Sequence, residues 1–565
     1  MSFPSQPTPT LEEQRLSRTR NQNSLGLLFT YLRLSGPGWF QSALTLGGGS
    51  LSSSLYLGVL TGYSLLWLQP LAMILGIVML SAIGYVTTST GVSPFRAINN
   101  HVNPILGWGW ALASLVASLV WSMPQYSLAT AVVQQNLFPD LLSGTFGKTI
   151  IVLTVLVVST TATWSYGQNR IGIKLYEVVL KVAVGLIVAC FIAVVITLIF
   201  SPKGLLWPSL LKGFIPDFQS FLRPSSQYLP LLQSIEEEHR PYWTSLIVQK
   251  QTDVIVSAAA TAVGINMTFL FPYLLLRRRW RRSHRNFVIF DLSIGMLIPF
   301  ILATSCVVVA AAKQFHLQPQ PGLTWGTNES RLGTASQLQQ KEFQTMMQGR
   351  IGARKDEIQS YSPTSFSTTE RKLAATLVTR DAFDLANSLQ PLTGRSFANL
   401  MFGLGVLGMA LSTITLLMLV SGLIICEIFN LPSTGWNYRL ATLTAAFGAL
   451  GPFVWNKAAF WLAIPTSVFG FTLLPLAYLT FLLLMNQRQF LGKDLPKGLR
   501  RWIWNILMIV ATGVASFGSL TMIWKKGGTW GITAAVTFAV AALLFHRRHL
   551  ASPTGEYESP EQYGR

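Results

Sequence analysis

Residues 36–54 read GPGWFQSALTLGGGSLSSS, an apolar segment with three consecutive glycines, Gly47 to Gly49, at its centre. The apolar run continues to residue 60, and about 20 such residues suffice to cross a bilayer. Each glycine lowers helix stability by about 1 kcal/mol relative to alanine, so the helix is predicted to break here. Inside a membrane, unwound backbone is tolerated only where it lines a cavity or a site. The segment is therefore predicted to be a broken membrane helix.

A second interrupted segment lies in the sixth apolar run, where residues 262–273 read AVGINMTFLFPY. Gly264, Asn266 and Pro272 favour an unwound middle there too. The two segments open two consecutive five-helix sets, and because five is odd the second set starts from the opposite side of the membrane. Interrupted helices at matching positions of inverted repeats are typical of a transporter's midplane site. Close helix packing at small residues is the alternative interpretation.

The composition excludes most classes of soluble protein. Only 11% of the residues are charged and 50% are hydrophobic, whereas a soluble domain carries about 25% charged residues. The net charge of +20 does not indicate nucleic-acid binding, because Lys and Arg lie in short clusters between apolar runs instead of along one soluble groove. We therefore expect a protein surrounded by a lipid bilayer, with no nucleic-acid partner.

Apolar runs of sufficient length predict twelve membrane-spanning helices. Very short gaps between some neighbours predict tight helical hairpins. The predicted spans are 36–60, 62–87, 104–135, 148–166, 175–200, 253–276, 287–312, 397–425, 438–455, 458–485, 502–524 and 529–545.

The distribution of Lys and Arg predicts the orientation of these spans. With the N-terminus inside, the inner loops hold fifteen Lys and Arg and the short outer loops hold four, and cytoplasmic loops carry the excess. Both termini are therefore expected in the cytoplasm, with the protein in the cell's inner (plasma) membrane. The predicted regions are a tail (1–34), a first inverted repeat (35–200), an external loop (201–252), a second inverted repeat (253–485) with an external insertion (313–395), two further helices (486–546) and a second tail (547–565).

Two longer segments face outward in this topology. Residues 236–238 are three glutamates followed by His239, a run that we interpret as a solvated acidic patch rather than a cation site. Within 313–395, Ser367 and Glu370 have the spacing of a capping box, which predicts the start of a helix. That helix is interpreted either as an outer lid or as a structural helix packed on its neighbours.

Acidic residues within or bordering the spans are few, and none lies at a predicted midplane. Glu177 and Lys181 are spaced i, i+4 and are predicted to pair near the inner face. Asp291 lies a few residues after Arg285, also near that face. Ion pairing at the interface is the preferred interpretation of these groups, and gating or proton movement is the alternative.

Several motifs resemble the natural-resistance-associated macrophage protein (Nramp) family of divalent-metal transporters. They are Gly36-Pro37-Gly38 before the first break, LKGFIP at 211–216, the sixth-span segment 262–272 and GVLGMALSTIT at 405–415. The likeness extends over most of the first ten spans. It implies an all-α integral membrane protein with a LeuT-like fold of inverted five-helix repeats, about 12 transmembrane helices, and broken first and sixth helices.

Three ligand motifs of that family are altered in this chain. The metal-binding aspartate and the histidine are both replaced, so the resemblance supports the fold more strongly than the metal chemistry. The family's Asp-Pro-Gly-Asn corresponds to Gly47-Gly48-Gly49-Ser50, its Met-Pro-His corresponds to Thr268-Phe269-Leu270 with Met267 one residue earlier, and its span-ten glutamine falls near Val468.

Oxygen and sulfur atoms around the two breaks form the candidate site. A hard divalent ion prefers oxygen ligands that include carboxylates, so this set is expected to hold a partly hydrated ion weakly and with low selectivity. Its candidate metal ligands are Ser50, Met267 and Thr268. The candidate substrate-binding residues are Thr45, Leu46, Gly47, Gly48, Gly49, Ser50, Asn266, Met267 and Thr268.

Three functions agree with this site. The first is an Nramp-like secondary transporter that moves a divalent metal cation by alternating access. The second is a LeuT-like transporter of an amino acid or small organic acid, whose carboxylate would bind the N–H groups of the glycine turn. The third is a non-transporting membrane sensor or scaffold. The sequence shows no Walker loop, so ATP use is not predicted, and it shows no catalytic constellation, so an enzyme is not predicted. Neither a cofactor nor a coupling ion is assigned.

Overall fold

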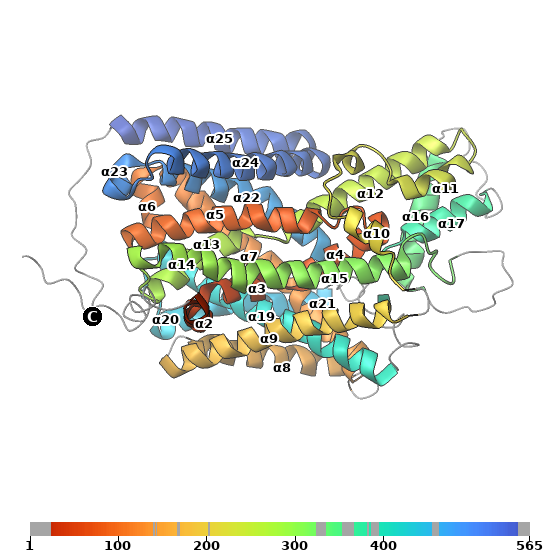
Figure 1. Cartoon of the computed structure of the whole chain (residues 1–565), viewed down its shortest axis with the longest axis horizontal. Coiled ribbons are helices and arrows are strands. Elements are labelled where there is room, and N and C mark those ends of the chain that lie inside the picture. The colour runs from red at the N-terminus through yellow and green to blue at the C-terminus, as the bar shows by residue number, and fades with distance from the viewer. Residues whose placement is uncertain are drawn as a thin grey trace, which may run out of the picture.

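The computed structural model of this chain is helical in all the regular elements it describes, and the long helices run roughly side by side (Figure 1). Among the described residues, nine helical stretches are long and apolar enough to cross a membrane, or ten when a bent pair is counted as one span. The chain is therefore a multi-pass membrane protein, as predicted. The structure describes residues 24–138, 142, 144–166, 170–201, 204–323, 335–352, 366–380, 384–385, 395–454 and 463–551.

The first repeat begins with two short helices in place of one long one. α3 (Pro37–Thr45) and α4 (Gly48–Thr61) meet at an angle of 55°, which confirms the predicted break. Pro37 suits the start of α3, where a backbone N–H would have no partner within the helix. The repeat continues through α5 (Leu68–Thr90), α7 (Pro104–Val132) with the π-helical turn η2 (Val133–Leu137), α8 (Gly144–Tyr166) and α9 (Arg170–Ile199).

The second repeat begins with the same kind of interruption. α12 (Arg240–Ala260) and α13 (Ile265–Arg277) flank an unwound segment at 261–264. The predicted span 438–455 consists of short pieces with a 3₁₀ centre, and it is not among the nine apolar stretches found in the described residues. The other elements are α14 (Arg285–Leu292), η6 (Ser293–Leu297), α15 (Ile298–Phe315), α19 (Arg395–Ile428), α20 (Gly435–Thr442), η8 (Leu443–Leu450), α21 (Gly451–Val454) and α22 (Ala463–Met485).

Two long helices follow the repeats. α24 (Gly498–Met522) leads through the π-helical turn η10 (Ile523–Gly527) into α25 (Gly528–Ala551). Gly528 has a φ of +54°, a left-handed conformation that favours glycine and turns the chain. α24 then packs on α5 and α22, whereas α25 packs on α7. The two therefore cover different parts of the bundle, although their hydropathy merges them into one apolar stretch.

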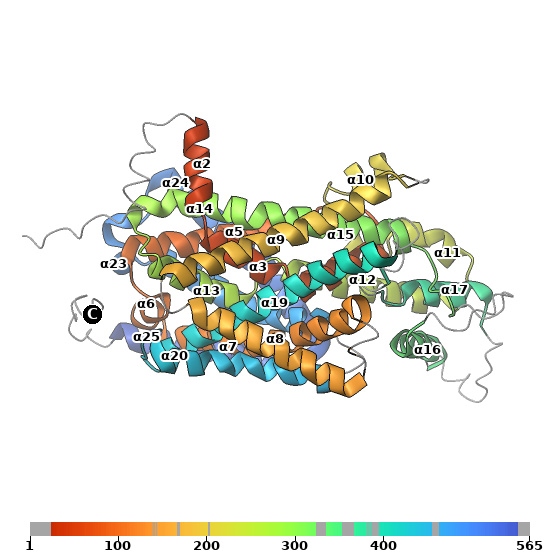
Figure 2. The same cartoon turned by 90° about the horizontal axis from the view of Figure 1, so that it is seen from below.

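The segments expected to be external contain more helix than predicted. α12 begins at Arg240, inside the segment 201–252 that was expected to be a loop, and that segment also holds α10 (Trp207–Lys212) and α11 (Leu229–Gln233). In the insertion, α16 (Gln337–Gly352) and α17 (Thr368–Leu377) lie at one end of the bundle (Figure 2). The predicted capping box is confirmed, since Glu370 N donates to Ser367 Oγ at 3.1 Å.

A short helix precedes the first repeat. α2 (Ser24–Leu34) lies across the direction of the long helices (Figure 2). Its Tyr31 packs edge-on against Phe287 and Phe290, with ring centroids 5.0 Å apart in both pairs. The parts of the predicted tails at 1–23 and 552–565 lie outside the described residues.

Candidate functional site

The first break is a tight, buried turn between α3 and α4. Gly47 links the two helices in an extended conformation, with φ −118° and ψ −173°. Its N–H donates to Thr45 O at 2.9 Å, and the N–H of Gly48 donates to Gln125 Oε1 of α7 at 3.1 Å. Two of the amides that the glycine turn could offer to a ligand are therefore already paired.

The glycines of this turn allow neighbouring helices to approach closely. A Cβ on Gly47 would lie 2.7 Å from Thr413 Oγ1 of α19, and one on Gly49 would lie 2.9 Å from Ser467 Oγ of α22. Real Cβ atoms essentially never come within 3.0 Å of such neighbours. The glycines thus serve packing as well as the break, so the two interpretations of the sequence are compatible.

The second break brings a sulfur atom against the first. Met267 Sδ accepts hydrogen bonds from Gly264 N and from Thr45 Oγ1, both at 3.3 Å. The Thr45 hydroxyl also lies 3.4 Å from Ala262 O. A hydroxyl, a thioether and a backbone carbonyl from the two breaks therefore meet at one buried point. Of the candidate residues, Thr45 and Met267 are the pair that touches across the breaks.

Three other candidate side chains turn toward their own helices. Ser50 Oγ donates to Gly47 O at 2.9 Å, and Thr268 Oγ1 donates to Ile265 O at 2.5 Å while it accepts from Trp110 Nε1 of α7 at 2.9 Å. Asn266 Oδ1 accepts from the N–H of Met267 at 3.0 Å. Hydroxyls and amides near helix starts often satisfy local backbone in this way. In this conformation these groups shape the turns.

Two residues that the sequence analysis did not select also lie at the first break. They are Gln125 of α7 and Thr413 of α19, which are 1% and 0% exposed. Thr413 Oγ1 donates to Ala43 O of α3 at 3.3 Å. An amide side chain within the apolar run 104–135 was the available signal for Gln125, because polar residues inside spans are costly and often functional.

The carboxylate of Asp291 accepts hydrogen bonds from the N-terminal end of α3. Both oxygens of Asp291 accept backbone N–H groups, from Gly36 at 2.7 Å and Gly38 at 2.6 Å. Asp291 therefore caps α3, and Arg285, its expected neighbour, pairs instead with Asp494 at 2.8 Å. In the described residues no group of three or more His, Cys, Asp or Glu side chains could hold a metal.

The ion pair predicted between Glu177 and Lys181, in the first half of α9, is also arranged differently. Glu177 pairs with Arg278, which follows α13, instead of with Lys181. Lys181 Nζ donates to Ser35 O at 2.6 Å, just before α3. Glu177 and Lys181 thereby link α9 to the residues just after α13 and just before α3. Residue spacing within one helix does not reveal such contacts.

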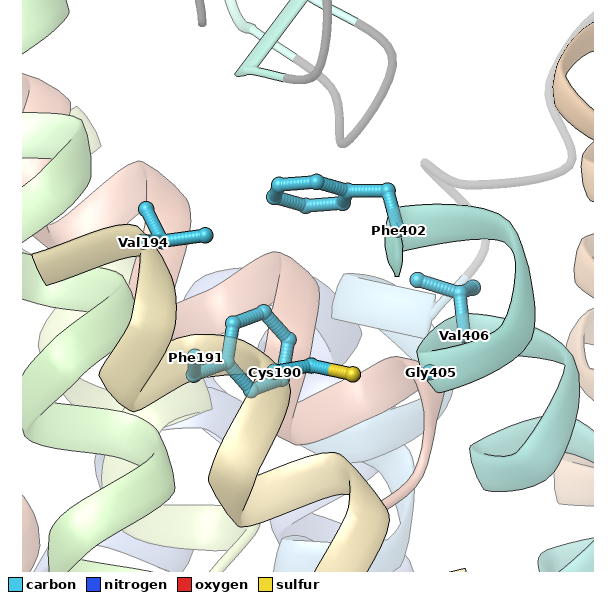
Figure 3. A pocket seen from close by; sticks show the side chains of 6 residues that line it. All are labelled: Cys190, Phe191, Val194, Phe402, Gly405 and Val406. Atoms are coloured by element: carbon cyan, nitrogen blue, oxygen red, sulfur yellow. The ribbon is translucent and has the colours of Figure 1, made fainter. Parts of the chain in front are cut away.

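A small apolar pocket lies between α9 and α19 (Figure 3). Its one potential metal ligand is the thiol of Cys190, and the other side chains are apolar. The pocket therefore lacks the donors of a metal or solute site. Its lining is Cys190, Phe191, Val194, Phe402, Gly405 and Val406.

Comparison with known proteins identifies relatives of this arrangement. The sequence matches the family described as natural resistance-associated macrophage protein-like (Nramp) over residues 38–341 and 366–525. No curated protein matches it significantly. The fold is similar to crystal structures of an Eremococcus coleocola manganese transporter, two of them of single-residue mutants and one of the complex with an aromatic bis-isothiourea substituted compound. Each shares 14% identity, covers 94% of this chain and 96% of its own, and has a TM-score of 0.61. The predicted fold is thereby confirmed.

Proposed function

This chain belongs to the Nramp-like family, and from that family and its site we propose that it is a secondary transporter of a divalent metal cation. The family consists of transporters, so the chain is classed as a transporter and not as an enzyme. The proposed mechanism is alternating access around the α3/α4 and α12/α13 breaks. The inner membrane and cytoplasmic termini remain part of this proposal, supported by the excess of Lys and Arg in the loops assigned to the inside.

The observation that carries the proposal is the position of the Met267 sulfur. The thioether lies where the two breaks meet, 3.3 Å from the Thr45 hydroxyl, and that hydroxyl lies 3.4 Å from the carbonyl oxygen of Ala262. A polarizable sulfur beside oxygens suits divalent transition metals better than Mg²⁺, which prefers oxygen alone. The manganese transporter with a similar fold supports the same class of cargo.

The pairing of the glycine amides argues against an anionic cargo. A carboxylate ligand requires N–H groups that point into the site, but those of Gly47 and Gly48 already donate to Thr45 O and Gln125 Oε1. Binding an amino acid or organic acid through these two amides would first break both hydrogen bonds. A cation requires lone-pair donors instead of N–H groups, and the oxygen and sulfur atoms at the breaks can supply them.

Transport assays on reconstituted protein test this proposal. We expect proteoliposomes to take up Mn²⁺ saturably. Met267→Leu keeps the volume but removes the sulfur, so it should weaken Mn²⁺ uptake about tenfold, equivalent to about 1.4 kcal/mol. Mg²⁺ uptake should change less than twofold. Met508→Leu, in a buried position on α24, is the matched control.

The same assay separates the alternatives. Uptake of an amino acid or organic acid without any divalent-metal flux would overturn the proposed cargo. Absence of all uptake by correctly folded protein would favour the sensor or scaffold. Equal Mn²⁺ uptake by wild type and Met267→Leu would show that the Met267 sulfur is not a ligand of the transported ion.

A further inference from the structure

We propose that Gln125 and Thr413 are neutral substrate ligands, which supply from α7 and α19 the oxygen atoms that the glycine turn cannot supply from its own side chains. The inference rests on the proposed divalent-cation transport and adds to its site. It predicts that the binding site carries no negative charge and that the bound cation keeps part of its hydration shell.

The position of both oxygens supports this role. A side chain on residue 47 would begin 2.7 Å from Thr413 Oγ1 and 3.5 Å from Gln125 Oε1. These two atoms therefore lie directly beside Gly47, and a side chain there would have to displace Thr413 Oγ1. They belong to α7 and α19, two helices that pack against each other, and α19 also packs against α3.

The chemistry of Gln125 also fits a ligand. A glutamine carbonyl oxygen has two lone pairs, and the N–H of Gly48 uses one of them. The second can accept a cation or one of its water molecules. Glutamine is seldom fully buried, yet Gln125 is 1% exposed within a membrane helix. Capping the start of α4 through Gly48 is the competing explanation for its presence.

Gln125→Glu separates the two explanations because it keeps the acceptor for Gly48 and adds a charge. If Gln125 only caps α4, Mn²⁺ binding to the purified full-length protein should stay within twofold of wild type. If it is a ligand, Mn²⁺ affinity measured by calorimetry should rise at least tenfold. The gain should disappear as the pH falls and the new carboxyl is protonated, whereas wild-type binding lacks this pH dependence.

Thr413→Val provides a second test if the glutamate variant does not fold. It removes the hydroxyl and conserves the shape, so Mn²⁺ affinity should fall about threefold or more. Thr415→Val is the matched control, because Thr415 Oγ1 donates to Ser412 O of its own helix. Unchanged affinity in folded Gln125→Glu or Thr413→Val would overturn this inference while wild-type Mn²⁺ uptake leaves the proposed function intact. A wild type that neither binds nor carries Mn²⁺ would overturn both.

Discussion

Asp291 is a buried carboxylate whose partners are backbone amides. Its two oxygens hold the N–H groups of Gly36 and Gly38 at the start of α3. Hydrogen bonds to a charged acceptor are stronger than neutral ones, and a negative charge at a helix N-terminus is favourable. This carboxylate therefore fixes α3 to α14 at the end of α3 opposite the glycine turn.

Removing the Asp291 carboxylate should loosen this attachment. Asp291→Ala leaves two buried N–H groups without an acceptor, at a cost of about 1–3 kcal/mol each. We expect a clearly lower melting temperature in detergent, and a smaller loss for Asp291→Asn, which retains one acceptor oxygen. If the alanine variant melted like wild type, the capping role would be wrong.

The candidate residues show what sequence reasoning could reach at this scale. Glycine, threonine and methionine in two interrupted spans were enough to select Thr45 and Met267, which the structure brings into contact. Gln125 and Thr413 were missed because their role depends on which helices pack beside the break, and hydropathy does not encode that. Ser50 was selected for its hydroxyl, but the nearby backbone carbonyl of Gly47 takes its hydrogen bond.

At the scale of elements, α16 and α17 form a cap that contacts α12 and α4, one half of each broken helix. Lys250 of α12 donates to Glu342 of α16 at 2.5 Å and to the hydroxyl of Tyr56 of α4 at 3.2 Å. Glu370 of α17 accepts from Trp243 Nε1 of α12 at 3.0 Å. The cap therefore connects α4 and α12, and most of α16 falls in the interval 342–365 that the family match leaves out.

The acidic run beside the cap divides into two parts. Glu236, Glu237 and Glu238 are exposed, in agreement with the interpretation as a solvated patch. His239 is buried, and its Nε2 lies 2.6 Å from Arg350 Nη2 of α16. The last residue of the run thus belongs to the contact between the cap and α12.

Breaking the Lys250–Glu342 pair should release the cap. We expect Glu342→Gln to speed hydrogen exchange in α16 at least tenfold, because it leaves the Lys250 charge partly buried without its partner. Lys526→Gln is the matched control, since Lys526 pairs with Asp253 of the same helix α12 and is a residue of η10, outside α16 and α17. Equal exchange in Glu342→Gln and wild type would show that other contacts hold the cap.

The docking of α17 should depend on pH through Glu370. Burial raises the pKa of this carboxyl, but hydrogen bonds from Trp243 and Ser367 and the charge of Arg350 outweigh burial and hold the pKa below its ordinary value of 4.5. A depressed folded-state pKa means that the stabilisation is complete above the ordinary value and is lost as the pH falls through the folded-state value.

We therefore expect hydrogen exchange in α17 to be independent of this group near neutral pH and to accelerate in acid below about pH 4.5. Glu370→Gln should remove the acid-dependent change attributable to this carboxyl. An identical acid response in the variant and wild type would assign the effect to other groups.

At the scale of the whole molecule, hydropathy predicted an all-helical membrane protein with interrupted helices at matching positions of two five-helix sets. The Nramp-like fold itself came from the resemblance of its motifs, which the family match confirms. The predicted bounds of a span were less accurate where its charged residues pair with residues far away in the sequence. The sixth span was expected to start at 253, but its first helix, α12, starts at Arg240. Lys250 and Asp253, the charges that bounded the predicted span, find partners on α16 and η10. The 3₁₀ centre of 438–455 was likewise not visible, since it has the same apolar composition as an α-helical span.

The proposed function requires that the break binds a cation and not an anion. Mn²⁺ binding to Gly47→Asp tests the charge of the cargo most directly. The variant is best made together with Thr413→Ala, because a Cβ at residue 47 would lie 2.7 Å from Thr413 Oγ1, and Thr413→Ala alone is the control. The account predicts that the added carboxylate raises Mn²⁺ affinity at least tenfold above that control. Unchanged or weaker Mn²⁺ binding by the folded double variant would contradict it.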